Sequence, residues 1–206
     1  FLQQILSVRP DARVIELVRD PRAALSSRKH RRTEEWLDAK ESQEQVEPDR
    51  TTNYDPLIDS YMWKESIDSA KDARKKFPGR VLSLRYEDMV SEPEAIIHRV
   101  CDFLDLPFRP EFLEVGWINA TSKDAQNAGE GISKAAVDRW KKSLTPEEIY
   151  VCQTALRNEL KEFGYAFEPI GLGAKAKTPV VLGRSAVHLA ARVGKRRPAG
   201  IDQRRS

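Results

Sequence analysis

Two short runs of β-branched and apolar residues constrain the fold of this chain more than any other feature. Residues 13–18 (RVIELV) and residues 80–86 (RVLSLRY) have the composition and length of buried strands. Between them, residues 56–77 carry apolar side chains at helical spacing, and a second amphipathic pattern covers residues 93–104. Strands separated by helices predict right-handed crossovers and a parallel sheet, and therefore an α/β fold.

The ends of the predicted helices are marked by capping residues. Asp20-Pro21 directly follows the first strand and is typical of a helix start, whereas Pro78-Gly79 ends the helix that begins near residue 56. A third helix is predicted over residues 146–163, because Thr145 precedes a proline and two acidic residues in its first turn.

The net charge of +3 conceals a strong asymmetry along the 206 residues. Residues 171–206 hold nine lysine and arginine residues against one aspartate, so the rest of the chain is net negative. Any electrostatic attraction to nucleic acid or acidic lipid therefore belongs to this segment. We expect residues 1–170 to form one domain and residues 171–206 to be a disordered basic tail, in which residues 185–193 could form a short amphipathic helix.

Cysteine content and hydropathy exclude several classes of protein. Cys101 and Cys152 lack metal-ligand spacing and lie among apolar residues, which favours two buried thiols, although their pairing and the compartment stay open. No run approaches the roughly 18 apolar residues that a membrane span requires. We therefore expect no metal site and no membrane span in this chain.

Arg19 and Tyr86 each follow one of the predicted strands, at its carboxyl end. In open parallel sheets, ligands bind beyond the carboxyl ends of the strands. An arginine there can pair bidentately with a phosphate, and the following helix presents backbone N–H donors at the same place. Ser27, eight residues after Arg19, adds a hydroxyl. By itself the pattern is also typical of a surface turn.

Three further residues have structural explanations that compete with chemical ones. Glu87 and Asp88 are paired carboxylates at a strand end, and we expect them to bond to the neighbouring backbone or to Arg85. Trp140 is expected in the core.

The strand-end segments resemble those of a known family. Residues 18–27 (VRDPRAALSS) are similar to the segment that binds the 3′-phosphate of 3′-phosphoadenosine 5′-phosphosulfate (PAPS) in PAPS-dependent sulfotransferases. Residues 84–90 (LRYEDMV) and 101–107 (CDFLDLP) resemble the family's second signature, in which Asp105 stands where glycine is common. The resemblance implies that Arg19 and Ser27 hold the 3′-phosphate and that Tyr86 contacts the nucleotide.

Two more nucleotide contacts follow from the resemblance. Residues 120–123 (ATSK) resemble a segment that lines the adenine pocket, which implies Thr121 as a contact, although Lys123 replaces the usual aromatic residue. Residues 133–135 (SKA) resemble the segment that closes over the 3′-phosphate, which implies Lys134 as its cation. The predicted cofactor-binding set is therefore Arg19, Ser27, Tyr86, Thr121 and Lys134, and these residues are expected to converge on one cleft.

The resemblance implies a P-loop-NTPase-like, three-layer parallel sheet, truncated at the N-terminus and helix-rich in its C-terminal part. It implies transfer of a sulfuryl group from PAPS, without a metal, to a hydroxyl or amine of a small molecule, carbohydrate or tyrosine. The residues around Trp140 and the last helix are most like those of the bacterial, carbohydrate and tyrosylprotein enzymes. The compartment is open, with the cytoplasm slightly favoured over the Golgi lumen.

The family's 5′-phosphosulfate loop and its catalytic base have no counterpart before Arg19, since residues 1–11 contain no glycine and one basic residue. We therefore expect both upstream of Phe1 and expect the chain alone to be inactive. An alternative is a nucleotide-binding or interaction module, derived from a sulfotransferase, that has lost catalysis. A basic-tailed nucleic-acid binder is a third hypothesis, but the body lacks a basic stripe with interleaved aromatic residues, so no nucleic-acid partner is expected.

Overall fold

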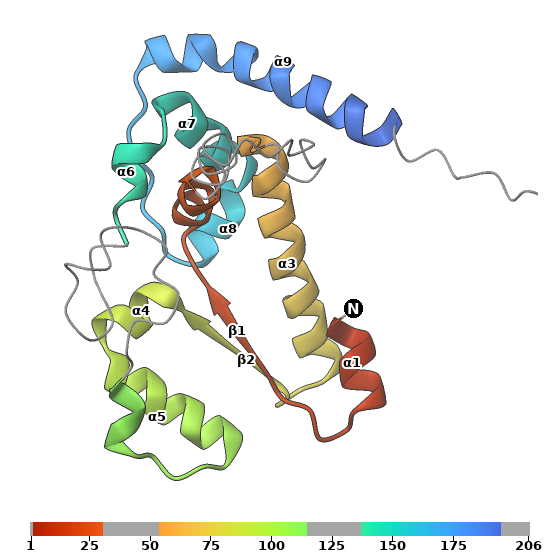
Figure 1. Ribbon diagram of the computed structural model, residues 1–206, viewed down its shortest axis with the longest axis vertical. Helices are drawn as coiled ribbons and strands as arrows, with labels where there is room; N and C mark the ends of the chain where they lie inside the picture. The colour runs from red at the N-terminus through yellow and green to blue at the C-terminus, as the bar shows by residue number, and fades with distance from the viewer. Residues whose placement is uncertain (1, 31–53, 115–136, 195–206) are drawn as a thin grey trace, which may run out of the picture. The chain divides into compact units, whose positions relative to one another are not determined.

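Two strands, β1 (Val14–Val18) and β2 (Val81–Arg85), pair in parallel in the computed structural model, which describes residues 2–30, 54–114 and 137–194 (Figure 1). Val14 lies opposite Val81, and the pairing continues in register to Val18 and Arg85. Both predicted strands and their parallel direction are confirmed. The result is a mixed α/β, helix-rich structure with a small parallel sheet.

Contacts divide the chain into two compact units, each described by itself below. The first comprises residues 1–26 and 62–143, and the second comprises residues 27–61 and 144–206. The helix of residues 21–30 and helix α3 (Pro56–Lys76) have residues in both units. The remaining helices of the first unit are α1 (Leu2–Val8), α4 (Tyr86–Ser91), α5 (Pro93–Leu104), the 3₁₀ turn η1 (Pro110–Leu113) and α6 (Trp140–Ser143).

One side chain fastens the beginning of the first unit to the start of β2. The guanidinium of Arg80 donates hydrogen bonds to the carbonyl oxygens of Leu6 (2.9 Å), Arg9 and Ala12 (3.0 Å). The Leu6 carbonyl lies in the last turn of α1, where Pro10, four residues on, has no N–H to donate. The carbonyls of Arg9 and Ala12 lie in the turn before β1. Beneath this contact, a small apolar core joins α1, α3 and β2 through Leu6, Ala73 and Val81.

Helix α3 ends one residue before the predicted boundary, and the glycine of the following turn explains the stop. Gly79 has a φ of +75°, a conformation that is disfavoured for residues with a Cβ atom. The backbone N–H of Arg80 donates to the carbonyl of Phe77 across this turn, at 3.2 Å. Pro78-Gly79 therefore sets the direction in which the chain enters β2.

Asp105 ends helix α5 in the left-handed conformation, with φ 56° and ψ 40°. It is the residue that stands where glycine is common in the family that the sequence resembles. Asp is one of the few residues other than glycine that adopt this conformation, because its short polar side chain forms local bonds. Here its carboxylate pairs with the guanidinium of Arg13, which also donates to the carbonyl of Phe103. The ion pair with Arg13, the residue before β1, thus helps an aspartate to take the place of glycine at this helix end.

The second unit contains α7 (Pro146–Ala155), α8 (Arg157–Glu162) and α9 (Leu172–Gly194). The predicted cap of α7 is confirmed, since the backbone N–H of Glu148 donates to the Thr145 hydroxyl and the Glu148 carboxylate accepts from the Thr145 N–H. The single helix expected over residues 146–163 is wrong, because Leu156 leaves the helical conformation (φ −114°, ψ 28°) between α7 and α8. The Leu156 side chain is fully buried at this break.

Helix α9 occupies residues 172–194, where a disordered tail was expected. It packs against α7, and its Ser185 hydroxyl donates to the Asp55 carboxylate at 2.8 Å. Among residues 172–189 of α9, the most deeply buried are the polar Thr178 and Ser185, so a search for apolar periodicity does not find this face. Residues 195–206 lie outside the described residues, and the division into a domain and a tail stays a prediction.

We expect Asp105→Ala to lower the free energy of unfolding by about 1 kcal/mol, because alanine keeps the left-handed strain and loses the bond to Arg13. Asp105→Gly should change it by less than about 0.5 kcal/mol, since glycine relieves the strain while the exposed ion pair contributes little. Urea unfolding of the two variants measures the difference. Equal losses for the two variants would contradict the role given to the left-handed backbone.

Candidate functional site

The two strands place Arg19 and Tyr86 side by side at their carboxyl ends. Because Val18 pairs with Arg85, the next residue of each strand leaves the sheet at the same level. The guanidinium carbon of Arg19 lies 4.8 Å from the centre of the Tyr86 ring, within the range of a cation–π contact. Both side chains are half-buried. The structure therefore brings together two of the five predicted nucleotide contacts.

The turn that carries Arg19 is held from two neighbouring helices. The indole N–H of Trp63, on α3, donates to the carbonyl oxygen of Arg19 at 3.1 Å. The carboxylate of Glu87, on α4, accepts a hydrogen bond of 2.9 Å from the backbone N–H of Asp20. These two bonds hold the turn from both sides, so the position of the Arg19 backbone is fixed by the packing of the first unit.

The structural explanations for the two carboxylates and the tryptophan are confirmed. Glu87 bonds to the backbone of Asp20, and Asp88 pairs with Arg85 at 3.4 Å. Trp140 is 3% exposed and belongs to the core of the first unit. The two carboxylates act as structural acceptors in these contacts.

Asp20 and Arg22 form a buried ion pair at the start of the helix that follows β1. Their side chains are 8% and 3% exposed, and the guanidinium donates to both carboxylate oxygens, at 2.7 and 3.0 Å. The same carboxylate accepts from the backbone N–H of Arg22 at 2.8 Å and so caps the helix. On its other side, the Arg22 guanidinium lies 4.2 Å from the centre of the Trp140 ring.

This pair gives the two arginines of the segment different functions. Arg22 points inward and neutralises the capping carboxylate, whereas Arg19 stands at the end of the strand against an aromatic face. Sequence reasoning predicted Asp20 as a cap but did not find its partners. The sequence does show an arginine two residues after a capping aspartate, which indicates that the two side chains can pair. The neighbouring residues do not indicate that this ion pair is buried.

The structure does not show the other three predicted nucleotide contacts together with Arg19 and Tyr86. Ser27 lies on the helix of residues 21–30, in the second unit. Thr121 and Lys134 lie outside the described residues, as does Lys123. The convergence of all five residues on one cleft stays a prediction.

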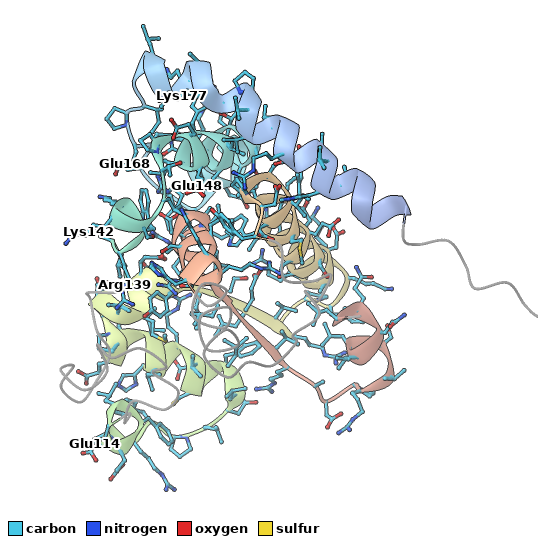
Figure 2. The ribbon with its side chains drawn as sticks, turned by 45° about the horizontal axis from the view of Figure 1, so that its top comes forward. Glu114, Arg139, Lys142, Glu148, Glu168 and Lys177 are labelled. Carbon is cyan, nitrogen blue, oxygen red and sulfur yellow. The ribbon has the colours of Figure 1, made fainter. Side chains whose placement is uncertain are left out.

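The second unit contains a cluster of ionisable side chains that sequence reasoning missed. The Lys29 ammonium lies 2.8 Å from the carboxylate of Glu148, the residue labelled near the start of α7 in Figure 2. Arg28 pairs with the buried carboxylate of Asp59 at 3.3 Å. Burial, and then the negative charge of Glu148, raise the pKa of the Tyr54 phenol well above its usual range. Tyr54 therefore stays a neutral phenol beside the ion pair of Lys29 and Glu148 even at alkaline pH.

The cysteines, possible metal ligands and helix hydropathy of the described residues bear on which other classes of site this part of the chain could hold. Both cysteines are buried, as expected, and they are free, which answers the open question of their pairing. In the described ranges, no three histidine, cysteine or acidic side chains are grouped so that they could hold a metal ion. None of the described helices is both long enough and apolar enough to cross a membrane.

Comparison with known proteins gives consistent matches. Residues 1–110 match the Sulfotransferase family. The chain is 29% identical to carbohydrate sulfotransferase 3 of Homo sapiens over 178 residues, which cover 80% of this chain and 36% of that protein. It is 30% identical to cytosolic sulfotransferase 4 of Arabidopsis thaliana over 112 residues, or 51% of this chain and 37% of that protein. The chain thus spans little more than a third of the length of either relative.

One solved structure extends the likeness to the fold. The sulfotransferase domain from the curacin biosynthetic pathway superposes with a TM-score of 0.51 at 22% identity. The superposition covers 77% of this chain and 55% of that domain. At this level of identity the likeness shows a shared fold.

We expect Arg22→Met to lower the free energy of unfolding by about 3 kcal/mol, because it leaves the Asp20 carboxylate buried without its countercharge. Arg9→Met is the matched control, since Arg9 also pairs with an aspartate two residues away, but both side chains are exposed. The control should leave the unfolding midpoint unchanged. Urea unfolding followed by circular dichroism measures both variants, and equal losses would contradict the importance of burial at the Asp20 pair.

Proposed function

Because this chain belongs to the sulfotransferase family, whose match covers residues 1–110, we propose that it takes part in transferring a sulfuryl group from PAPS to an acceptor. The acceptor is a hydroxyl or amine of a small molecule, a carbohydrate or a tyrosine. Both relatives described above are named as sulfotransferases, and the name of one specifies carbohydrate. The likeness to a solved sulfotransferase domain supports a P-loop-like fold. We propose that the complete fold is a three-layer structure around a parallel sheet.

The observation that carries the proposal is the position of Arg19 on the ring of Tyr86 at the ends of two paired parallel strands. A guanidinium offers several N–H donors in a planar fork that matches the oxygens of a phosphate. The aromatic face supports one side of the fork without consuming any of its hydrogen-bond donors. An arginine with this support, beyond the carboxyl ends of parallel strands, suits the binding of a nucleotide phosphate.

We assign the 3′-phosphate of the nucleotide to Arg19, with Ser27 and Lys134 as further contacts, and the nucleoside to Tyr86 and Thr121. For Arg19 and Tyr86 the assignment is supported by their shared place at the strand ends. For Ser27, Thr121 and Lys134 it rests on the resemblance of their sequence segments. The bonds from Trp63 and Glu87 would keep Arg19 in place when an anion is absent, which lowers the cost of ordering it on binding.

PAPS would supply an activated sulfuryl group. In the transfer, a bond forms between the acceptor oxygen or nitrogen and sulfur while the bond between sulfur and the 5′-phosphate oxygen breaks. The acceptor proton passes to a base, and 3′-phosphoadenosine 5′-phosphate leaves. We assign no residue of this chain as the base. The proposed contribution of the described residues is to bind and orient the nucleotide, which is a major part of catalysis in group transfer of this kind.

We expect Arg19→Ala to weaken the binding of 3′-phosphoadenosine 5′-phosphate by about ten- to a hundredfold, because a charge-assisted phosphate contact is worth roughly 1.5 to 3 kcal/mol. Arg19→Lys should fall between the alanine variant and the wild type, since it keeps the charge but loses the bidentate fork. Titration calorimetry on the 206-residue chain measures the three affinities. Adenosine 5′-phosphate, which lacks the 3′-phosphate, should bind weakly and should not distinguish the variants.

Arg109→Ala is the matched control, because Arg109 is an exposed arginine of the same unit. It should bind the nucleotide as the wild type does. If the wild-type chain shows no affinity for the nucleotide, the proposed nucleotide site is wrong. If Arg19→Ala binds as tightly as the wild type, the site is elsewhere in the chain.

A further inference from the structure

Helix α9 buries one side and exposes the other. Thr178 and Ser185 are 7% and 2% exposed, and Ala174, Val181 and His188 on the same side are half-buried. The spacing of three and four residues places all five on one face of the helix. This face packs on the rest of the second unit, where His188 lies 3.1 Å from the carboxylate of Asp55. The opposite face is consequently turned outward.

The outward face of α9 is an uncharged, mostly apolar stripe. Leu172, Val180 and Val187 are 82%, 69% and 68% exposed. At 3.6 residues per turn they fall with their small neighbours in an arc of about 100°. The small neighbours on the stripe, all exposed, are Ala176, Pro179 and Gly183. Exposed apolar side chains that line up along one helix face indicate an interaction surface.

Cationic side chains flank this stripe on both sides. Lys177, labelled on α9 in Figure 2, and Arg184 lie along one edge, and Lys175 lies along the other, where its ammonium is 5.7 Å from the centre of the Tyr150 ring. Residues 172–194 contain no aspartate or glutamate, and the segment of residues 171–206 holds nine basic residues against one acidic residue. The helix itself thus combines an apolar stripe with cations and no acidic residue, while Glu147 at the start of α7 interacts electrostatically with Lys177.

We propose that the outward face of α9 lies on the surface of an anionic lipid membrane. In such a position the stripe enters the boundary between headgroups and acyl chains, while the long lysine and arginine side chains reach the lipid phosphates. Each cation near an anionic surface strengthens binding by about fivefold. Because one face of the helix is buried against the protein and the opposite face is apolar, the helix would lie in the plane of the interface.

Charge and hydropathy favour the membrane over two other occupants. A nucleic acid would contact the cations and leave the apolar stripe against a charged backbone, which opposes its burial. A second copy of α9 would bring two positively charged helices together without an acidic residue on either. An anionic bilayer matches both the stripe and its basic edges.

The experiment measures co-sedimentation of the whole chain with vesicles of phosphatidylcholine alone and of phosphatidylcholine mixed with phosphatidylglycerol. We expect binding to the anionic vesicles only, with an affinity that falls as salt is added. Val180→Asp with Val187→Asp should lower the partition coefficient at least tenfold, because two carboxylates then face the acyl boundary. Lys177→Ala with Arg184→Ala should lower it by about thirtyfold, from two lost cations.

The matched control for the aspartate pair is Val8→Asp with Leu106→Asp. These residues are also exposed and apolar, at 74% and 51%, and the change in charge is the same. The control should bind as the wild type does, and circular dichroism should show wild-type helix content in every variant compared. A dye attached through Val187→Cys should be quenched by lipids with spin labels near the acyl boundary.

Three results would overturn the proposal. The first is equal binding to neutral and anionic vesicles, or binding to neither. The second is loss of binding in the lysine and arginine variant but not in the aspartate variant, together with tight binding of the wild type to duplex DNA. The third is a self-association in solution that the aspartate pair abolishes, which would assign the stripe to a second copy.

Discussion

The in-register parallel pairing of β1 with β2 is the constraint on which the first unit depends. It places the residues that follow the two strands at one level, and so it brings Arg19 against Tyr86 and the backbone of Asp20 against Glu87. A shift of the register by one residue would move each side chain to the other face of the sheet. The candidate site is therefore a property of the strand pairing rather than of a loop.

Most of the regular structure could be predicted from the sequence, because it is determined locally. The β-branched runs, the capping box at Thr145 and the stop at Gly79 each specify an element through contacts within a few residues. No capping residue or proline in the sequence marks the break at Leu156. The burial of Ser185 could not be predicted, since it depends on Asp55, which lies 130 residues away in the sequence. For the same reason, the sequence suggested Arg19 and Tyr86 separately, and only the strand register shows that they touch.

The buried ion pair of Asp20 and Arg22 bears on how a site at the strand ends can attract an anion. A capping carboxylate stabilises the start of a helix, but its negative charge would oppose an anion at the same place. The Arg22 guanidinium cancels this charge within the core and is itself covered by Trp140. The field near Arg19 is then set by Arg19 and the helix amides to a greater extent than by the cap.

The bonds of Arg80 to the carbonyls of Leu6, Arg9 and Ala12 bear on the order of folding. Arg80 is 74 residues from Leu6, so this contact forms only after a long loop has closed, whereas the turns of α3 form from neighbours in the chain. Interactions that appear after the transition state slow unfolding and leave the folding rate nearly unchanged. A late contact at this position would make Arg80 a determinant of how long the first unit stays folded more than of how fast it folds.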